Sequence, residues 1–129
     1  MGAKPVKPDN GKYTIQGKNN RNLELTLDDR DLKKYIVEEL DGDDMNSKLP
    51  ASNPPGVTIN WFACFSIYNN QNGNKGGHAT VKYSFTVNLD PGQRLFVAYG
   101  GQAHEVTDEI KNNGKVTLSI GDPPAGSFP

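Results

Sequence analysis

The sequence predicts a mainly β protein, folded as an antiparallel β-sandwich. Several short segments alternate apolar and polar residues with the period of two that marks a half-buried strand. The 129 residues include 14 Gly and 9 Pro, a composition typical of many turns. Only 34% of the residues are hydrophobic, which suits strands that face water on one side. A chain of this length can bury a core without metal, and its single cysteine excludes an intrachain disulfide.

The clearest strand is "ATVKYSFTVNL", residues 79–89, in which every second residue is apolar. It ends at "DPGQ", where Pro91 and Gly92 suit a type II turn, and "RLFVAY" then returns as the second strand of a hairpin. Shorter strands are expected from the alternation in "KYTIQ", "NLELTL", "KVTLSI" and, more weakly, "AHEVT".

The segment "VTINWFACFSIY", residues 57–68, is apolar on both faces. Trp61 shares one face with the aliphatic residues, so we place it on the core side, and Phe62, Cys64 and Tyr68 fall on the second face. Such a strand is either central and covered on both sides, or it carries an exposed apolar patch that recruits a partner.

Residues 28–40 fit either a short helix or a strand. Read as a helix, the segment has acidic residues in its first turn and Gly42 beyond its end, and Leu32, Ile36 and Leu40 share one stripe. Read as a hairpin, "DDRD" is the turn and "LKKYIVEEL" the returning strand. The capping residues and the spacing favour one short helix here, which would cover the second face of the central strand.

Composition divides the chain into three parts. Residues 1–10 are polar with two prolines and suggest a flexible leader, residues 11–121 form the single sandwich domain, and the Pro- and Gly-rich residues 122–129 suggest a tail.

The stretch "YSFTVNLDPGQRLFVAY" resembles a pattern that recurs in immunoglobulin-like and fibronectin-like modules of surface proteins, where an alternating strand ends in Leu-x-Pro-Gly. The resemblance covers 17 residues and implies an immunoglobulin-like or jelly-roll-like sandwich. It implies a fold and not an activity.

Charge and hydropathy argue against nucleic acid as a partner and against a membrane span. The net charge of -1, from 14 basic and 15 acidic residues, provides no field to attract nucleic acid. No segment approaches the length of an apolar membrane span, and the first residues lack the apolar core of a signal peptide. The compartment therefore stays open, with secretion or a cell-surface location expected if the chain was trimmed from a precursor.

The acidic run "LDGDDMN" is a candidate calcium site. Its carboxylates, those of Asp41, Asp43 and Asp44, lie within four residues of one another, and calcium prefers oxygen ligands. The run lacks the remaining ligands of an EF-hand loop, so a plain acidic turn is the alternative. No other cofactor is expected.

The insert "NNQNGNKGGH" between two apolar segments is the main candidate for ligand binding. It contains no aliphatic or aromatic side chain, and long ordered loops are often functional. We expect contacts with a ligand from the insert and from aromatic or imidazole side chains beside it and further along the chain: Tyr68, Asn69, Asn70, Gln71, Asn72, Asn74, Lys75, His78, Tyr99 and His104.

These observations predict a non-catalytic binding module for protein interaction, adhesion or assembly, with contacts made by loops at one end of the sandwich. Carbohydrate binding is the first alternative, because amides and aromatic rings suit sugar recognition. A small hydrolase that uses His78 or His104, with or without Cys64, is the second. A partner, or a second copy in a homodimer, could add a strand to an unpaired sheet edge.

Overall fold

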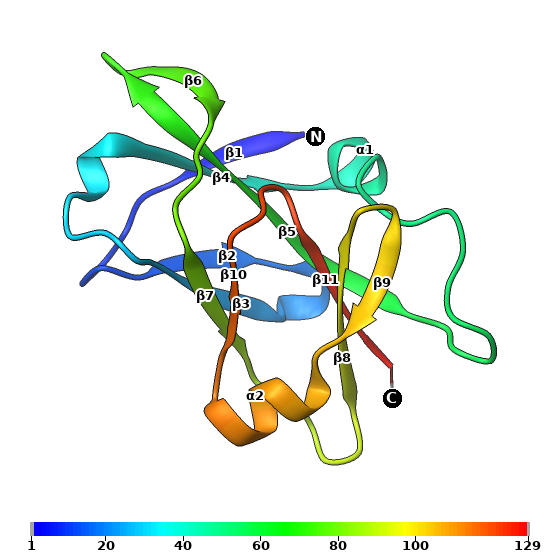
Figure 1. The fold of residues 1–129 in the computed structure, drawn as a ribbon. Helices are drawn as coiled ribbons and strands as arrows, with labels where there is room; N and C mark the ends of the chain where they lie inside the picture. Colours follow the sequence, from blue (N-terminus) through cyan, green and yellow to red (C-terminus); the bar gives the residue numbers. More distant parts are fainter. Residues whose placement is uncertain (1, 129) are drawn as a thin grey trace.

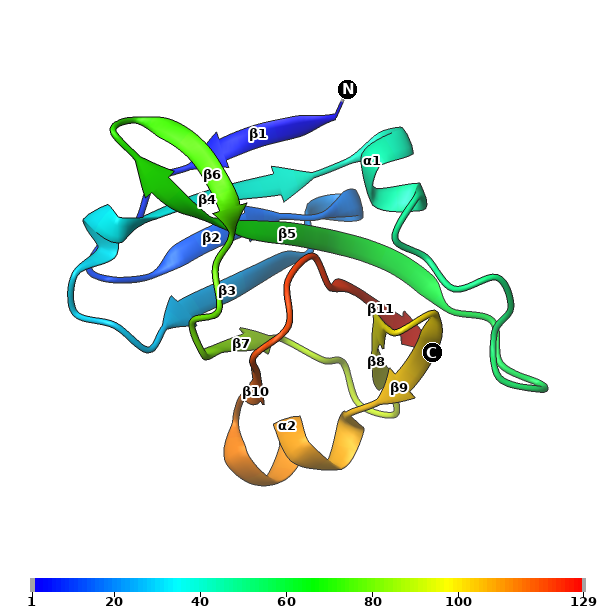
Figure 2. The same ribbon diagram turned by 45° about the horizontal axis from the view of Figure 1, so that its top comes forward.

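The computed structural model describes residues 2–128, which form two antiparallel sheets packed face to face (Figures 1 and 2). The larger sheet has the order β1-β4-β5-β11-β8-β9, with β6 also paired to β5. Its strands are β1 (Ala3–Val6), β4 (Tyr35–Leu40), β5 (Asn60–Gln71), β6 (Asn74–His78), β8 (Arg94–Tyr99), β9 (Gln102–Glu105) and β11 (Pro124–Phe128). The predicted β-sandwich is confirmed.

The smaller sheet has the order β10-β7-β3-β2, and two short helices complete the fold. The strands are β2 (Tyr13–Gln16), β3 (Asn22–Leu27), β7 (Tyr83–Val87) and β10 (Val116–Leu118). The helices are α1 (Gly42–Asn46) and α2 (Thr107–Asn113), and 3-10 turns cover Lys18–Asn20 and Leu32–Lys34.

The core lies between the two sheets and follows the alternation in the sequence. The apolar side chains of β3 and β7 are buried, and their polar neighbours face outward. Phe65 of β5 meets Tyr83 and Phe85 of the opposite sheet edge to face, with ring centroids 5.2 and 6.4 Å apart. Such pairs add about 0.5–1.5 kcal/mol each beyond the area that they bury.

The segment 28–40 contains a single 3-10 turn followed by a strand, so the helix favoured by its caps is wrong for residues 35–40. The helical part is the single turn Leu32–Lys34, which Asp31 caps by accepting a hydrogen bond from the Lys33 backbone N–H. Residues 35–40 form β4, which pairs with β1 on one side and β5 on the other. Ladder hydrogen bonds to two neighbours outweigh the weak local preference for a helix.

Strand β5 is covered on both faces, as its sequence predicts. The helix on its outer face, however, is not the one expected at residues 28–40. Cys64 packs with Leu40 and Met45 on the outer face of the larger sheet, and Met45 belongs to α1. The covering element is therefore the short helix that follows β4, and not residues 28–40.

The placement of Trp61 on the core face is wrong because β5 carries a β-bulge. The register between β5 and β11 shifts between Ala125 and Gly126, which leaves Phe62 as an extra residue. Phe62 therefore joins the core, while the half-buried Trp61 ring lies against Gly126 instead. A bulge reverses the alternation of all residues on one side of it, and the sequence contains no signal for it.

The flexible leader and tail are also contradicted by the structure. Residues 3–6 form β1, and residues 124–128 form β11 in the interior of the larger sheet, between β5 and β8. "PPAGSF" does not look like a strand because it contains two prolines, a glycine and other small residues. Small residues are required there, since a Cβ added to Gly126 would lie 2.5 Å from Ile59 and 2.8 Å from Trp61.

Candidate functional site

The insert "NNQNGNKGGH" is a β-hairpin that projects from the body of the molecule (Figures 1 and 2), and the expectation of a long loop is wrong. Strand β5 continues to Gln71, and β6 returns after the two-residue turn Asn72–Gly73. Both turn residues have positive φ, 55° and 90°, as a type I′ turn requires. The Asn-Gly pair inside the insert is the local signal for this turn.

Asn70 fixes the tip of the hairpin. Its Oδ1 accepts a hydrogen bond from the Gly73 backbone N–H at 2.7 Å, and its Nδ2 donates to the Lys33 carbonyl at 3.0 Å. The second bond ties the hairpin to the 3-10 turn before β4. The tip is thus held by a side chain, while Gln71, Asn72 and Asn74 remain exposed.

The base of the hairpin lies where β5 changes its partner. One edge of β5 pairs with β11 up to Cys64 and with β6 from Tyr68 onward. The chain leaves β6 at His78 and enters β11 just after Asp122, so these two side chains meet at the junction. His78 Nε2 lies 3.2 and 3.0 Å from the two carboxylate oxygens of Asp122.

Lys48, from the segment after α1, completes the contacts of Asp122 with its Nζ 3.1 Å from Oδ2. Burial opposes ionisation of Asp122, yet hydrogen bonding from Ser66 and Lys48 and the charge of His78 hold its pKa below the usual range. Lys48 is the main contributor, because its Nζ is 3.1 Å from Asp122, whereas the buried Ser66 Oγ makes no hydrogen bond of ordinary geometry within residues 2–128. Asp122 also has a left-handed φ of 54°, a conformation more common for Asp than for most residues.

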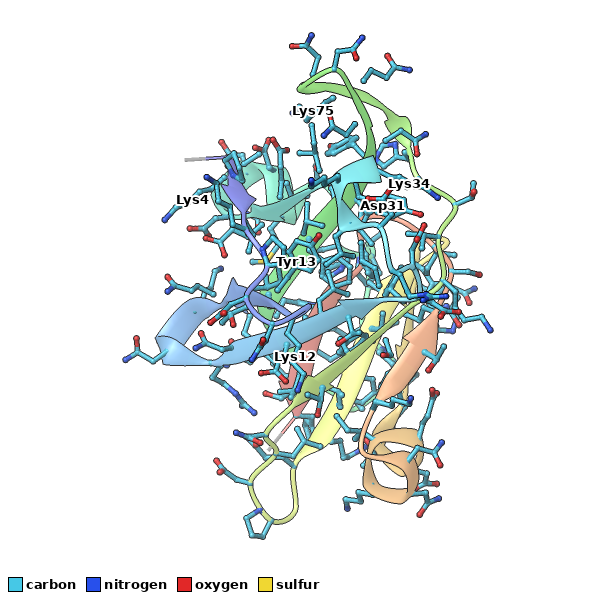
Figure 3. All side chains as sticks on the ribbon, turned by 90° about the vertical axis from the view of Figure 1, so that its left-hand side faces the viewer. Lys4, Lys12, Tyr13, Asp31, Lys34 and Lys75 are labelled. Atoms are coloured by element: carbon cyan, nitrogen blue, oxygen red, sulfur yellow. The ribbon has the colours of Figure 1, made fainter. Side chains whose placement is uncertain are left out.

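A second ion pair holds the middle of β6. Lys75 Nζ lies 3.2 Å from each carboxylate oxygen of Glu38, which is only 6% exposed on β4. Figure 3 shows Lys75 on the projecting hairpin. The hydrogen bond that Lys75 donates to Glu38, together with the negative charge of Glu38, raises the pKa of Lys75. Lys75 Nζ also lies 5.1 Å from the centre of the Tyr68 ring, and the His78 ring lies 4.8 Å from it.

We call this set the outer-face cluster: Glu38, Lys48, Ser66, Tyr68, Lys75, His78 and Asp122. Two nearly buried carboxylates are matched by two lysines and a histidine, so the charges satisfy one another. Lys75 and His78 contact the Tyr68 ring, so this ring is poorly placed to stack on a ligand. The cluster therefore anchors the hairpin.

Cys64 lies beside this cluster, in a buried environment that disfavours the nucleophilic thiolate at neutral pH. Burial raises the pKa of its thiol to about 12, and the Sγ donates weakly to the Asp122 carbonyl at 3.8 Å. The thiolate is the reactive form of cysteine, so a dyad of Cys64 with His78 lacks its nucleophile. A dyad of Cys64 with His104 is not formed either, because His104 stacks on Tyr99.

Tyr99 and His104 form a separate pair on the β8–β9 hairpin. Their rings are nearly parallel, with centroids 3.7 Å apart and an interplanar angle of 13°. Within residues 2–128 no hydrogen bond, ion pair or ring contact joins this pair to the outer-face cluster. The structure therefore divides the ten residues expected to contact a ligand between two hairpins.

The acidic run does not gather into a calcium site. Asp41 caps α1, with its Oδ1 accepting the Gly42 backbone N–H at 2.7 Å, and Asp43 and Asp44 lie in the first helical turn. Across the described part of the chain, no three His, Cys, Asp or Glu side chains converge in a way that could hold a metal ion. Acids at a helix N-terminus favourably oppose its dipole, which explains the run.

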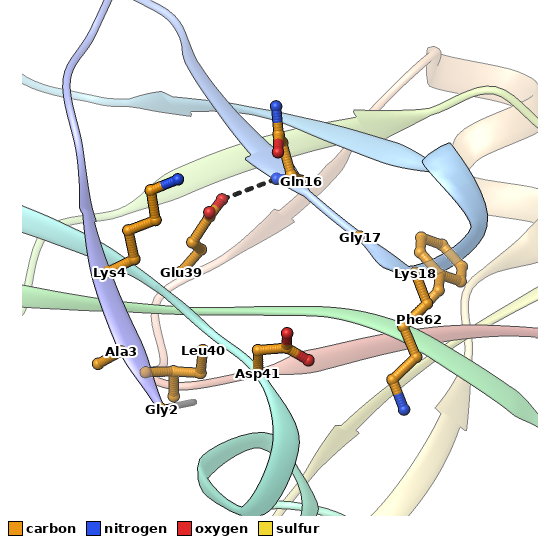
Figure 4. A pocket seen from close by; sticks show the side chains of 10 residues that line it. All are labelled: Gly2, Ala3, Lys4, Gln16, Gly17, Lys18, Glu39, Leu40, Asp41 and Phe62. Carbon is orange, nitrogen blue, oxygen red and sulfur yellow. Dashed lines mark hydrogen bonds between the residues drawn. The ribbon is translucent and has the colours of Figure 1, made fainter.

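A cleft of about 330 Å³ opens between the start of β1, the end of β4 and the end of β2 (Figure 4). Glu39 crosses it and accepts a hydrogen bond from the Gln16 backbone N–H at 2.8 Å. The register pairs Lys4 with Glu39, and Phe62 contributes to the lining. Since Glu39 already joins the two sheets, we assign the cleft a structural role.

The sequence analysis missed four members of the outer-face cluster: Glu38, Lys48, Ser66 and Asp122. Asp122 lies in a segment whose sequence suggests a tail. Glu38 lies in residues 28–40, whose sequence fits either a helix or a strand. The one available signal was Ser66, a polar residue inside an otherwise apolar strand.

Comparison with family models, with curated proteins and with solved structures finds no match to this chain. No helix in residues 2–128 is long and apolar enough to cross a membrane. Any functional conclusion must therefore come from the geometry of the two hairpins.

Proposed function

We propose that this protein is a non-catalytic binding module that recognises a protein partner through the β5–β6 hairpin. The observation that carries the proposal is the free edge of β6. Within residues 2–128 this strand pairs with β5 alone, and its residues are exposed except for the half-buried Gly76. Backbone N–H and C=O groups on such an edge can pair with an extended segment of another protein.

Gly77 supports this use of the edge. Its φ lies outside the left-handed region, and a Cβ added to it would meet no atom within 4 Å. Neither the backbone conformation nor the packing of this chain requires glycine there. Glycine inside a strand weakens the strand, and it often marks a place where another backbone approaches closely.

The anchoring of the hairpin supports the same function. An edge that recognises a partner loses less entropy on binding when it is already ordered. The ion pairs Lys75–Glu38 and His78–Asp122 fix the middle and the base of β6, and Asn70 fixes the tip. The exposed amides of the tip then offer hydrogen bonds that select the partner.

The proposal is tested by adding a charge to the free edge. Lysine on an edge strand discourages strand addition, so Gly77→Lys is expected to abolish capture of the partner from a lysate of the source cells. The matched control is Thr14→Lys, which adds the same charge at an exposed position of β2 on the other sheet.

Both variants should keep the melting temperature of the parent protein to within a few degrees. Equal capture of the same protein by Gly77→Lys and by Thr14→Lys would refute strand addition at β6. Capture that survives removal of Asn70–Gly77 would exclude the hairpin as a whole.

A further inference from the structure

We infer that the tip of the β8–β9 hairpin is a second binding site, independent of β6, and that its ligand is a carbohydrate. Figures 1 and 2 show this tip well away from the β5–β6 hairpin. Its central residue is Tyr99, which within residues 2–128 is the one large hydrophobic side chain that is exposed, at 37%.

Tyr99 is held rigidly. The turn after it, Gly100–Gly101, has positive φ at both residues, 61° and 77°, so β8 and β9 are joined by the tightest kind of hairpin turn. One face of the Tyr99 ring is covered by the parallel His104 ring at 3.7 Å. The exposed area of the side chain therefore comes from the remaining face and the ring edge.

The hydrogen bond of His104 selects one tautomer of its neutral ring. Its Nε2 lies 3.1 Å from the Tyr99 carbonyl oxygen, which can only accept a hydrogen bond. In the neutral ring Nε2 therefore carries the hydrogen, and Nδ1 is left as an acceptor. This hydrogen bond also fixes the orientation of the imidazole beneath the phenol ring.

Gln102 adds polar groups on the same side. The register pairs Tyr99 with Gln102 and Val97 with His104, and directly paired residues of an antiparallel ladder share one face. The exposed Gln102 amide can donate and accept. The open aromatic face is thus accompanied by one amide on the same side of the hairpin, while the imidazole packs beneath the opposite face of the ring.

This combination fits a sugar better than other planar or apolar ligands. The C–H face of a pyranose ring packs on an aromatic ring, while its equatorial hydroxyls need donors and acceptors at the edge of that ring. Nucleotides would also need cations for their phosphates. The adjacent charges are those of Glu105 and Arg94, which neutralise each other at 2.8 Å.

The inference is tested by titrating the full, ¹⁵N-labelled chain with a β-1,4-linked glucose tetramer, an N-acetylglucosamine trimer and a mannose trimer at millimolar concentrations. We expect at least one of them to shift the Gln102 side-chain amide and the backbone amides of residues 99–104. Tyr99→Ala should weaken that binding by about tenfold or more, and Tyr99→Phe should retain it.

Tyr68→Ala is the matched control, because it removes an aromatic ring from the other hairpin and should leave sugar binding unchanged. Absence of shifts at residues 99–104 with all three sugars would overturn the inference, as would equal binding by the Tyr99→Ala protein. Since Gly77→Lys should bind sugar normally, failure at one hairpin is distinguishable from failure at the other.

Discussion

Cys64 illustrates how one buried side chain limits the chemistry of a surface. Its thiol lies among Leu40 and Met45, and burial raises its pKa to about 12. We therefore expect no reaction with a mild thiol reagent in the native state at neutral pH, and complete reaction after denaturation. Rapid native labelling, followed by absorbance of the released thiol, would contradict this placement and reopen a role for the cysteine in catalysis.

Two glycines in strands of the larger sheet should respond to alanine in opposite ways. At Gly126 an added Cβ collides with Ile59 and Trp61, so Gly126→Ala is expected to lower the free energy of unfolding by about 1–3 kcal/mol. At Gly77 the Cβ has room, so Gly77→Ala should raise it by about 0.4–1 kcal/mol. Urea denaturation of both variants measures the difference, and equal effects would disprove the close contact at β11.

The Arg94–Glu105 pair on β8 and β9 makes stability depend on pH. Two hydrogen bonds from Arg94 lower the pKa of Glu105 to about 2. A depressed carboxyl pKa contributes stability above the unfolded value, and this contribution is lost as the pH falls through the folded value.

Wild type should therefore be more stable than Glu105→Gln near neutral pH, and the difference should vanish between about pH 4.5 and 2. The effect is small because both side chains are more than a third exposed, at 39% and 38%. Thermal melts of both proteins across this range provide the measurement. A difference that grows toward low pH would contradict the assignment.

At the scale of elements, the outer-face cluster should control the mobility of one hairpin without affecting the core. Asp122→Asn removes the charge that attracts Lys48 and His78 at the base of β6. We expect faster amide exchange in residues 74–79 and unchanged exchange in β3 and β7, measured by hydrogen–deuterium exchange. Uniformly faster exchange would mean that the contact stabilises the whole fold and not the hairpin.

Elements with strong local signals were predictable from the sequence. The alternation in β3 and β7 places every second residue in the core, as expected. The strand β4 was ambiguous, because only pairing with β1 and β5 decides between helix and strand. The bulge at Phe62 and the interior strand β11 have no local signal at all, since both depend on which strand lies next to which.

The residues of the candidate sites also divide into those with a local signal in the sequence and those that only the fold brings together. Tyr68, Lys75 and His78 were predictable because they are close in sequence and flank one turn. Their partners Glu38 and Asp122 lie 37 and 44 residues from Lys75 and His78, so only the folded sheet brings them together. The stacking of Tyr99 and His104 across a Gly-Gly turn also needed the register of β8 with β9.

At the scale of the whole molecule, the two strands nearest the ends of the chain should matter very differently. Removing residues 122–129 deletes β11, which pairs with both β5 and β8, so we expect loss of the cooperative thermal transition. Removing residues 2–7 deletes β1, which pairs with β4 alone in the sheet, so the fold should survive with reduced stability. Circular dichroism melts distinguish the two, and equal losses would contradict the sheet order.

The position of β11 also has a consequence for how the protein is made. Strands β5 and β8 leave the ribosome well before residues 124–128, yet within residues 2–128 these two strands are linked to each other in the larger sheet only through β11. Until β11 arrives, each of them carries an unpaired edge with the apolar residues of the future core beside it. The nascent chain is thus exposed to aggregation until residues 124–128 have been synthesised, and bound chaperones would be needed longest at these two strands.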